Sequence, residues 1–321
     1  MLLVLAVAVI GVLSLCVGAE SVSPGQVLQA LSGSGKGTVA FRIVRYVRLP
    51  RTCAGLLAGA ALAVSGVIIQ GVLANSLAAP STIGVNAGAG LAVAVCCALA
   101  PTAASATPFA AMFGAFGGAM LVLFIAERTG ASKITLILAG MAVSSIFSAG
   151  IDAVITFVPE ALNGYSDFRI GGLSGISMAR LTPACWLILG SILAALSLHN
   201  ELDVLMLGTE QAQSLGLPAG RIRRLFLLLS AVLAGAAVSF SGLLGFVGLI
   251  VPHMMRRLVG EESGILLAAS ALGGAGLLCA CDLLARVIFA PYELPVGIVM
   301  SLVGGPFFVG LLLRRRGGNH P

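Results

Sequence analysis

The sequence has little charge and few aromatic residues. Only 9% of its 321 residues are Asp, Glu, Lys or Arg, whereas roughly 25% is usual in globular proteins. That shortage excludes a soluble enzyme and a disordered chain. The 18 basic residues lie mostly between apolar runs rather than in one patch, which excludes a nucleic-acid binder.

Sequence motifs for catalysis are also missing. The chain has no Gly-x-x-x-x-Gly-Lys-[Ser/Thr] loop for nucleotide phosphates and no His-Glu-x-x-His zinc motif. We therefore expect no cofactor and no enzymatic activity. The seven cysteines lie inside or beside apolar runs, and we interpret them as small packing residues rather than as disulfides or metal ligands.

The chain is rich in apolar residues and in glycine. Apolar residues make up 59% of it and the mean hydropathy is +1.09, values that indicate an integral membrane protein. With 42 glycines and only 6% aromatic residues, its helices are expected to pack closely through small side chains.

Ten transmembrane segments are predicted, since a helix needs about 20 residues to cross roughly 30 Å of hydrocarbon. The uncharged run 225–253 is divided in two because glycines and Pro252 interrupt it. The first run lacks a basic leader, so it is predicted to be a span and not a signal peptide. The segments lie near 1–18, 52–74, 83–100, 108–126, 134–157, 184–198, 225–245, 246–253, 264–286 and 294–313.

Cytoplasmic loops are rich in Lys and Arg, and here the two sides have ten and eight basic residues, or ten and three when the first loop is set aside, which gives the expected orientation. Ten spans place both termini on one side, predicted to be cytoplasmic, together with Arg128, Lys133, Arg221, Arg223, Arg224, Arg256, Arg257, Arg314, Arg315 and Arg316. The other side has Arg169, Arg180 and Arg286, and a basic first loop with Lys36, Arg42, Arg45, Arg48 and Arg51. This exposed first loop either receives an acidic partner or is simply solvated.

An internal repeat favours a transporter. Residues 57–67 (LAGAALAVSGV) and 233–243 (LAGAAVSFSGL) are identical at seven of eleven positions. They belong to the second and seventh segments, so they run in opposite directions, as in transporters with inverted repeats. The alternative is that two Ala/Gly-rich helices look alike by chance.

A hydrophilic stretch, 205–218, separates the sixth and seventh segments. It is predicted to contain a short amphipathic helix with Thr209 as its N-cap, Glu210 in its first turn and Gly216 at its C-terminal stop. Such a helix on the cytoplasmic side is a docking element, and a surface linker is the alternative.

A set of motifs along the chain carries a family likeness. They are Arg48-Leu-Pro-Arg51, Gly59–Gly66 with Gln70, Leu77-Ala-x-Pro80, Leu207-Gly208 with Ala212 and Leu215-Gly216, Gly245–His253 with Arg256, Asp282, Arg286, Glu293–Gly297 and Gly304–Phe308. From about residue 20 to 313 the chain resembles the FecCD-type permeases of bacterial ABC importers for vitamin B12 and iron chelates.

This resemblance implies an all-α integral membrane fold of about ten spans with an inverted repeat, the type II ABC importer permease architecture, in one permease domain over 1–321. It implies a homodimer, or a pair with a paralogous permease, in the bacterial inner membrane. Cytoplasmic ATPase subunits and an outer substrate-binding protein would be its partners. The cargo would be a ferric siderophore, then haem, or cobalamin, moved by alternating access.

The resemblance also implies roles for particular residues. The helix that couples to the ATPase maps to Gly208, Thr209, Glu210, Ala212, Leu215 and Gly216, and the arginines that dock the binding protein map to Arg48, Arg51 and Arg286. The cytoplasmic gate maps to Asn75 and Leu77. Here Ala74-Asn-Ser-Leu-Ala78 replaces the usual Arg-Asn-Pro-Leu-Ala, and the loss of proline at Ser76 predicts a looser turn.

Three further residues have open interpretations. Asp152 lies in an apolar run and is either part of the translocation path or a structural carboxylate. Asp282 and Arg286 have the i,i+4 spacing of an ion pair. His253 near a helix end is favoured as structural. A secondary transporter driven by an ion gradient is the alternative function, and it would use Asp152 and Asp282.

Overall fold

Helices make up all the regular structure in the described part of the chain, which in this computed structural model is residues 1–18, 20–101, 103, 105–129 and 133–316. In chain order they are α1 (Leu2–Cys16), α2 (Pro24–Leu31), α3 (Val39–Arg42), a π-helical turn (Ile43–Arg48), α4 (Leu49–Leu73), a 3₁₀ turn (Pro80–Ile83), α5 (Val85–Leu99), α6 (Thr107–Arg128), α7 (Lys133–Phe157), α8 (Ala161–Ile170), α9 (Met178–Ser197), α10 (His199–Met206), α11 (Thr209–Ser214), α12 (Ala219–Ser241), α13 (Val247–Val259), α14 (Ser263–Val287) and α15 (Val296–Arg316).

The ten predicted apolar segments all coincide with helices. Within the described residues, six helical stretches are long and apolar enough to cross a membrane, and α1, α5 and part of α15 are shorter apolar helices. The remaining segment, 246–253, lies in α13 (Val247–Val259). Between the sixth and seventh segments the chain forms two helices, α10 and α11, where one was expected.

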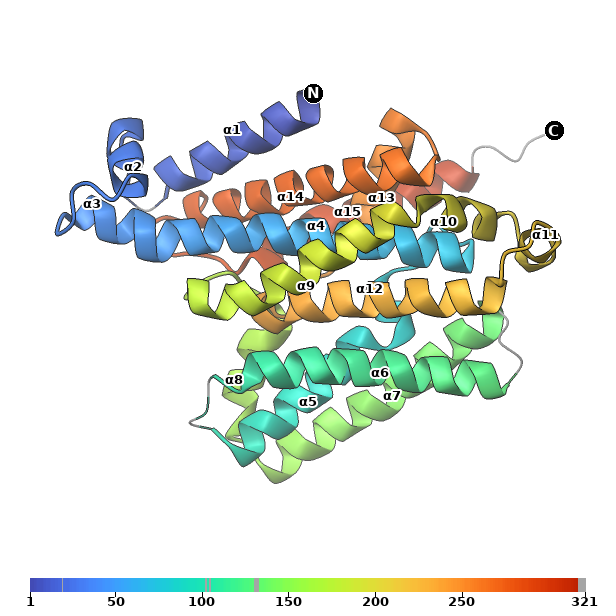
Figure 1. Cartoon of the computed structure of the whole chain (residues 1–321). Helices are drawn as coiled ribbons and strands as arrows, with labels where there is room; N and C mark the ends of the chain where they lie inside the picture. Colours follow the sequence, from blue (N-terminus) through green and yellow to red (C-terminus); the bar gives the residue numbers. More distant parts are fainter. Residues whose placement is uncertain (19, 102, 104, 130–132, 317–321) are drawn as a thin grey trace.

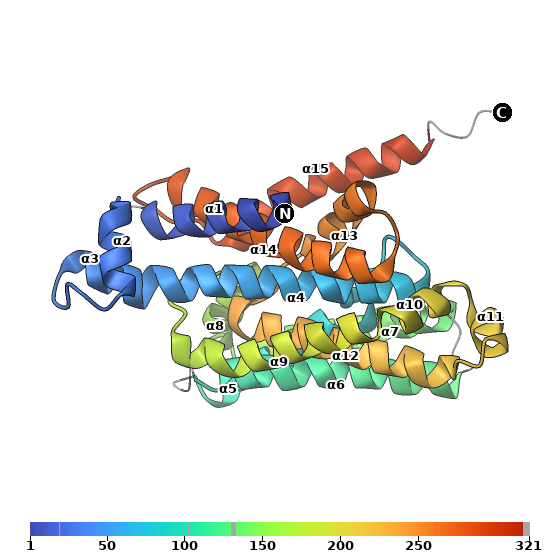
Figure 2. The same cartoon turned by 45° about the horizontal axis from the view of Figure 1, so that its top comes forward.

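The centre of the bundle is α4, which packs against α14 on one side and α12 on the other (Figures 1 and 2). Glycine makes these contacts possible. A Cβ on Gly59 would lie 2.1 Å from the carbonyl oxygen of Gly274 in α14, and one on Gly66 would lie 2.1 Å from that of Gly248 in α13. The expected close packing through small residues is therefore confirmed.

The two repeat stretches lie in α4 and α12, which run side by side in opposite directions (Figure 1). A buried hydroxyl contact joins the two helices, with the Oγ atoms of Ser65 and Ser230 2.7 Å apart. The inverted arrangement predicted from the repeat is thus present in the fold.

The basic first loop is largely helical, which corrects the sequence expectation. The helix of α4 extends back through the π-helical turn and α3 to Val39. Its π-helical turn ends just before Pro50, which has no N–H to donate to the carbonyl four residues earlier. Arg42 and Arg45 are exposed on this extension, and Lys36 is exposed in the loop just before it.

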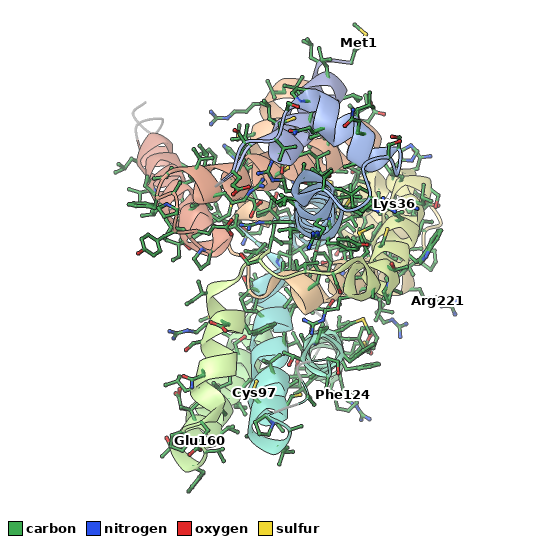
Figure 3. The ribbon with its side chains drawn as sticks, turned by 90° about the vertical axis from the view of Figure 1, so that its left-hand side faces the viewer. Met1, Lys36, Cys97, Phe124, Glu160 and Arg221 are labelled. Atoms are coloured by element: carbon green, nitrogen blue, oxygen red, sulfur yellow. The ribbon has the colours of Figure 1, made fainter. Side chains whose placement is uncertain are left out.

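The bundle has two ends, named here by their helices. At the α11 end, α6 and α10 finish and α7 and α12 begin, while α2 and α3 mark the α2 end (Figure 1). Arg128 and Arg221 belong to the α11 end, as their grouping on one side predicted. Lys133, Arg314, Arg315 and Arg316 lie outside the described side chains. Viewed from the α2 end, α5 and the α7–α8 pair stand below the main bundle (Figure 3).

Candidate functional site

The short helix α11 forms one tip of the molecule, joined to α10 and α12 (Figures 1 and 2). Its N-cap is Gly208, at φ +120°, and Thr209 is the first helical residue. Thr209 was expected to be the cap. Its hydroxyl instead accepts a 2.7 Å hydrogen bond from Nη2 of Arg223 in α12, which ties α11 to the next spanning helix.

The C-terminal end of α11 is closed by backbone hydrogen bonds. Gly216, at φ +83°, donates to the carbonyl of Gln213, and Leu217 donates to that of Ala212, the pattern of a Schellman motif. Gly216 thus ends the helix as predicted. Ala212 is fully buried, while Leu207 and Leu215 are 61% and 65% exposed. Ala212 thus anchors one face of the helix, and the two exposed leucines lie before its first residue and after its last.

The predicted gate residues lie in the turn after α4. Ala74 takes the left-handed conformation at φ 46° and ends that helix. The side-chain oxygen of Asn75 accepts a 2.9 Å hydrogen bond from the N–H of Leu77, and Ala78 donates to the Asn75 carbonyl. These two hydrogen bonds close the turn that lacks the proline. Asn75 and Leu77 are half-buried.

Gln70 ties this turn to two helices. It is 2% exposed, and its amide nitrogen donates to the carbonyls of Ala78 and Gly248, at 3.3 and 3.1 Å. Its amide oxygen accepts from Nη1 of Arg256 in α13. Both ends of one buried amide are thus satisfied, and α4, the gate turn and α13 are fixed to one another.

The arginines predicted to dock a partner are buried, which corrects the expectation that the first loop is exposed at Arg48 and Arg51. Arg48, Arg51 and Arg286 are 4%, 4% and 3% exposed. Nε of Arg51 lies 3.0 Å from Asp282, and Nε of Arg286 lies 3.1 Å from the same carboxylate. The predicted i,i+4 pair of Asp282 and Arg286 is confirmed. A buried guanidinium needs such partners because its desolvation is costly.

Two of these arginines also hold the end of α1. Arg48 donates to the backbone carbonyls of Leu15, Cys16 and Glu20, and Arg286 donates to the hydroxyl of Ser14 at 2.6 Å. The carbonyls at a helix C-terminus have no partners within the helix. The arginines supply those partners and so join α1 to α4 and α14.

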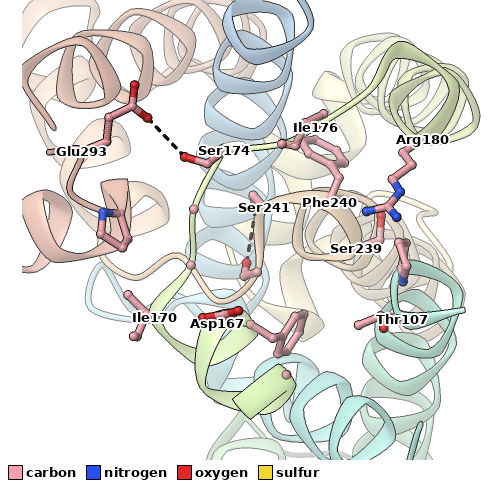
Figure 4. Close-up of a pocket in the computed structure, with 18 residues that line it drawn as sticks. Thr107, Asp167, Ile170, Ser174, Ile176, Arg180, Ser239, Phe240, Ser241 and Glu293 are labelled. Atoms are coloured by element: carbon pink, nitrogen blue, oxygen red, sulfur yellow. Dashed lines mark hydrogen bonds between the residues drawn. The ribbon is translucent and has the colours of Figure 1, made fainter. Parts of the chain in front are cut away.

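Glu293 is a site residue that the sequence analysis left without a role. Its Oε2 lies 2.5 Å from Nη1 of Arg51 and 3.5 Å from the hydroxyl of Ser174, and its side chain is 37% exposed. It also lines a cavity of about 480 Å³ between α8, α9 and α12, with Asp167 and Arg180 (Figure 4). No local pattern indicates this role, because Arg51 and Glu293 lie 242 positions apart.

Asp152 lies on the outer face of α7. It is exposed, as are Ser145, Ser148 and Thr156, which share its side of the helix. This polar stripe on an otherwise apolar helix faces away from the rest of the chain. The other open residue, His253, packs edge-on against Phe307, with the ring centroids 5.9 Å apart. Among the described residues no group of three His, Cys, Asp or Glu side chains is placed to hold a metal ion.

Comparison with known proteins finds relatives along nearly the whole chain. The sequence profile of the FecCD transport family matches residues 5–314. The hemin transport system permease protein HmuU of Yersinia pestis is 39% identical over 280 residues, 84% of this chain and 83% of that protein. The Fe(3+)-citrate import system permease protein YfmE of Bacillus subtilis is 38% identical over 306 residues, 95% of this chain and 91% of that protein.

A solved structure agrees with these sequence matches. A chain described as part of a metal-chelate type ABC transporter, in an inward-facing conformation, superposes with a TM-score of 0.87 at 30% identity. The match covers 97% of each chain.

Proposed function

The chain belongs to the FecCD transport family and is the permease subunit of an ABC importer, and we propose that it imports a ferric chelate in a complex driven by separate ATPase subunits. The observation that carries the proposal is the family match, which spans residues 5–314. In this proposal the whole bundle acts as one permease domain. Hemin and Fe(3+)-citrate, named in two relatives, favour iron. A ferric siderophore is the first candidate, then haem, and cobalamin is the alternative cargo.

We propose α11 as the element that couples to the ATPase. It is anchored by buried Ala212 and by the bond from Arg223 to Thr209, and it presents exposed Leu207 and Leu215. An anchored tip with exposed apolar side chains suits contact with a partner. Glu210 adds an exposed charge in its first turn. In this arrangement the α11 end, with both termini, is cytoplasmic.

The α2 end would then receive the substrate-binding protein. Exposed Lys36, Arg42 and Arg45 supply the positive charge that attracts an acidic partner. Of the three buried arginines, Arg51 approaches the surface through the half-exposed carboxylate of Glu293. We propose that Arg48, Arg51 and Arg286 support this docking surface by joining α1, α4 and α14 under it.

The translocation path would run along the polar stripe of α7, with Asp152 in it, between two copies of the chain or a copy and a paralogous permease. The exposed apolar side chains of α7, such as Met141 and Ile146 at 62% and 68%, need such a partner or lipid. The turn with Asn75 and Leu77 would close the path at the α11 end, and alternating access would follow from motion of α11.

Purification of the tagged chain from its own membranes tests this function. We expect ATPase activity to co-purify, to be lost when 209–215 is replaced by a Gly/Ser linker, and to be retained when Lys36, Arg42 and Arg45 are changed to Gln at the opposite end. Proteoliposome uptake with ferric siderophore, hemin and cobalamin then identifies the cargo. A chain that purifies alone and transports on an ion gradient would contradict the proposal.

A further inference from the structure

A second cavity, of about 280 Å³, lies at the α11 end between α6, α7 and α12. One part of its lining is apolar, with Leu123, Leu136 and Leu227 only 6%, 5% and 1% exposed. The other part is charged and consists of Arg223 and Arg224 of α12 and Glu127 of α6. Apolar and cationic walls therefore meet in one small space.

The charged part has one net positive charge, from two arginines and one glutamate. Nε of Arg224 lies 3.3 Å from Glu127, and these side chains are 54% and 44% exposed, so a ligand can reach them. Arg223 is half-buried and is held in place by its bond to Thr209. Both guanidinium groups thus line the cavity, and that of Arg223 is tied to α11.

The surroundings of the cavity are those of a membrane interface. It lies at the first turns of α12, a helix long and apolar enough to span. Phe124 and Leu225 beside it are 56% and 38% exposed, and the guanidinium of Arg128 lies 5.3 Å from the Phe124 ring centroid. Apolar side chains exposed next to arginines mark the level of the lipid headgroups.

We propose that this cavity binds an anionic phospholipid, with its phosphodiester at Arg223 and Arg224 and its glycerol and upper acyl chain against the three leucines. A phosphodiester carries one negative charge, which matches the net charge of the rim, and arginine binds phosphate through several N–H donors. A basic pocket between spanning helices is the usual form of such a site. The bound lipid contacts Arg223, the residue that holds α11, and so strengthens the attachment of the coupling helix.

Lipid binding to the purified full chain tests the proposal, by native mass spectrometry with phosphatidylglycerol and phosphatidylcholine as probes. We expect one phosphatidylglycerol per chain to be retained in preference to phosphatidylcholine. Each arginine near an anionic headgroup contributes about fivefold in affinity, so R223Q/R224Q should weaken binding about 25-fold. R221Q is the matched control, because Arg221 is exposed on the same turn and lies outside the cavity (Figure 3).

A second variant tests the volume of the cavity without changing its charge. Gly220 lines the cavity, and a Cβ there meets nothing within 4 Å, so G220L adds apolar bulk at the cavity without a clash at its Cβ and without a change of charge. It should also abolish the preference for phosphatidylglycerol. Equal binding of the two lipids by the unaltered chain, or an equal loss in R221Q, would overturn the proposal.

Two other occupants have their own signatures, and either would refute the lipid site. Competition by sn-glycerol 1-phosphate as strong as that by phosphatidylglycerol would indicate a site for soluble phosphate. Absence of lipid binding, with loss of co-purified ATPase in R224Q, which leaves the bond from Arg223 to Thr209 in place, would indicate an acidic protein partner. Lipid binding is measured on the purified chain without cargo or ATPase, so the lipid site and the proposed function can fail independently.

Discussion

Asp282 lies between Arg51 and Arg286, and all three side chains are 5% exposed or less. A buried carboxylate between two guanidinium groups contributes little net stability, because desolvation offsets most of the attraction. Its removal is different, since it leaves two buried positive charges without their common partner. The contact therefore determines how α4 and α14 are placed rather than how stable the chain is overall.

The asparagine variant of this carboxylate should show that asymmetry. We expect Asp282→Asn to lower the free energy of unfolding by about 3–5 kcal/mol, measured by thermal or denaturant unfolding in detergent. Glu293→Gln is the control, because that side chain is 37% exposed and a solvated pair is worth about 1 kcal/mol or less. Equal losses in the two variants would show that Asp282 is not the centre of the cluster.

Between elements, backbone contact at glycine sets the spacing of the helices. Gly59 in α4 and Gly274 in α14 leave no room for a side chain on either helix. By contrast, a Cβ added to Gly117 in α6 would have nothing within 4 Å of it. The same residue type is therefore required in one helix and replaceable in another.

Alanine at these two glycines tests that difference. We expect Gly59→Ala to destabilise the chain by about 1–3 kcal/mol through overpacking, seen as a lower melting temperature in detergent. Gly117→Ala should be neutral or slightly stabilising, because alanine favours helix over glycine. A melting temperature that is unchanged in Gly59→Ala would mean that α4 and α14 can separate at no cost.

The gate turn depends on Gln70, which joins α4 to α13. Leucine at this position has a similar volume but leaves the Ala78 and Gly248 carbonyls without their donor. A buried hydrogen bond lost in this way costs about 1–3 kcal/mol. The turn with Asn75 and Leu77 should then open more often.

Thiol labelling measures that opening. In a chain with Ser76→Cys, we expect Gln70→Leu to speed maleimide labelling at residue 76 about tenfold, from a cost near 1.4 kcal/mol. Gln29→Leu on exposed α2 is the control and should leave the rate unchanged. The same labelling rate in all three chains would remove Gln70 from the gate.

For the molecule as a whole, apolar runs were enough to predict the helices, because a membrane span must be long and apolar whatever it packs against. The repeat likewise predicted that α4 and α12 are antiparallel. Burial of Arg51 could not be predicted, since its partners Asp282 and Glu293 lie 231 and 242 positions away. Such pairs depend on tertiary packing, and no local spacing of residues indicates them.

The ion-gradient alternative needed two carboxylates, and the structure bears on both. Asp282 is ion-paired with both Arg51 and Arg286, so its carboxylate oxygens are already occupied by two guanidinium groups. Asp152 lies in a different helix, on the exposed stripe of α7. It is the one carboxylate among the residues that define this stripe. Carriers coupled to ions usually have convergent acidic residues at the centre of the membrane.

Energy coupling should therefore depend on nucleotide alone. In proteoliposomes that contain the complete complex, we expect uptake to require ATP and to persist when proton and sodium gradients are dissipated by ionophores. Asp152→Asn should change the uptake rate by less than about tenfold, since a path residue tunes passage and does not drive it. Uptake that continues without ATP and stops with the ionophores, or in Asp152→Asn, would reassign the chain to secondary transport.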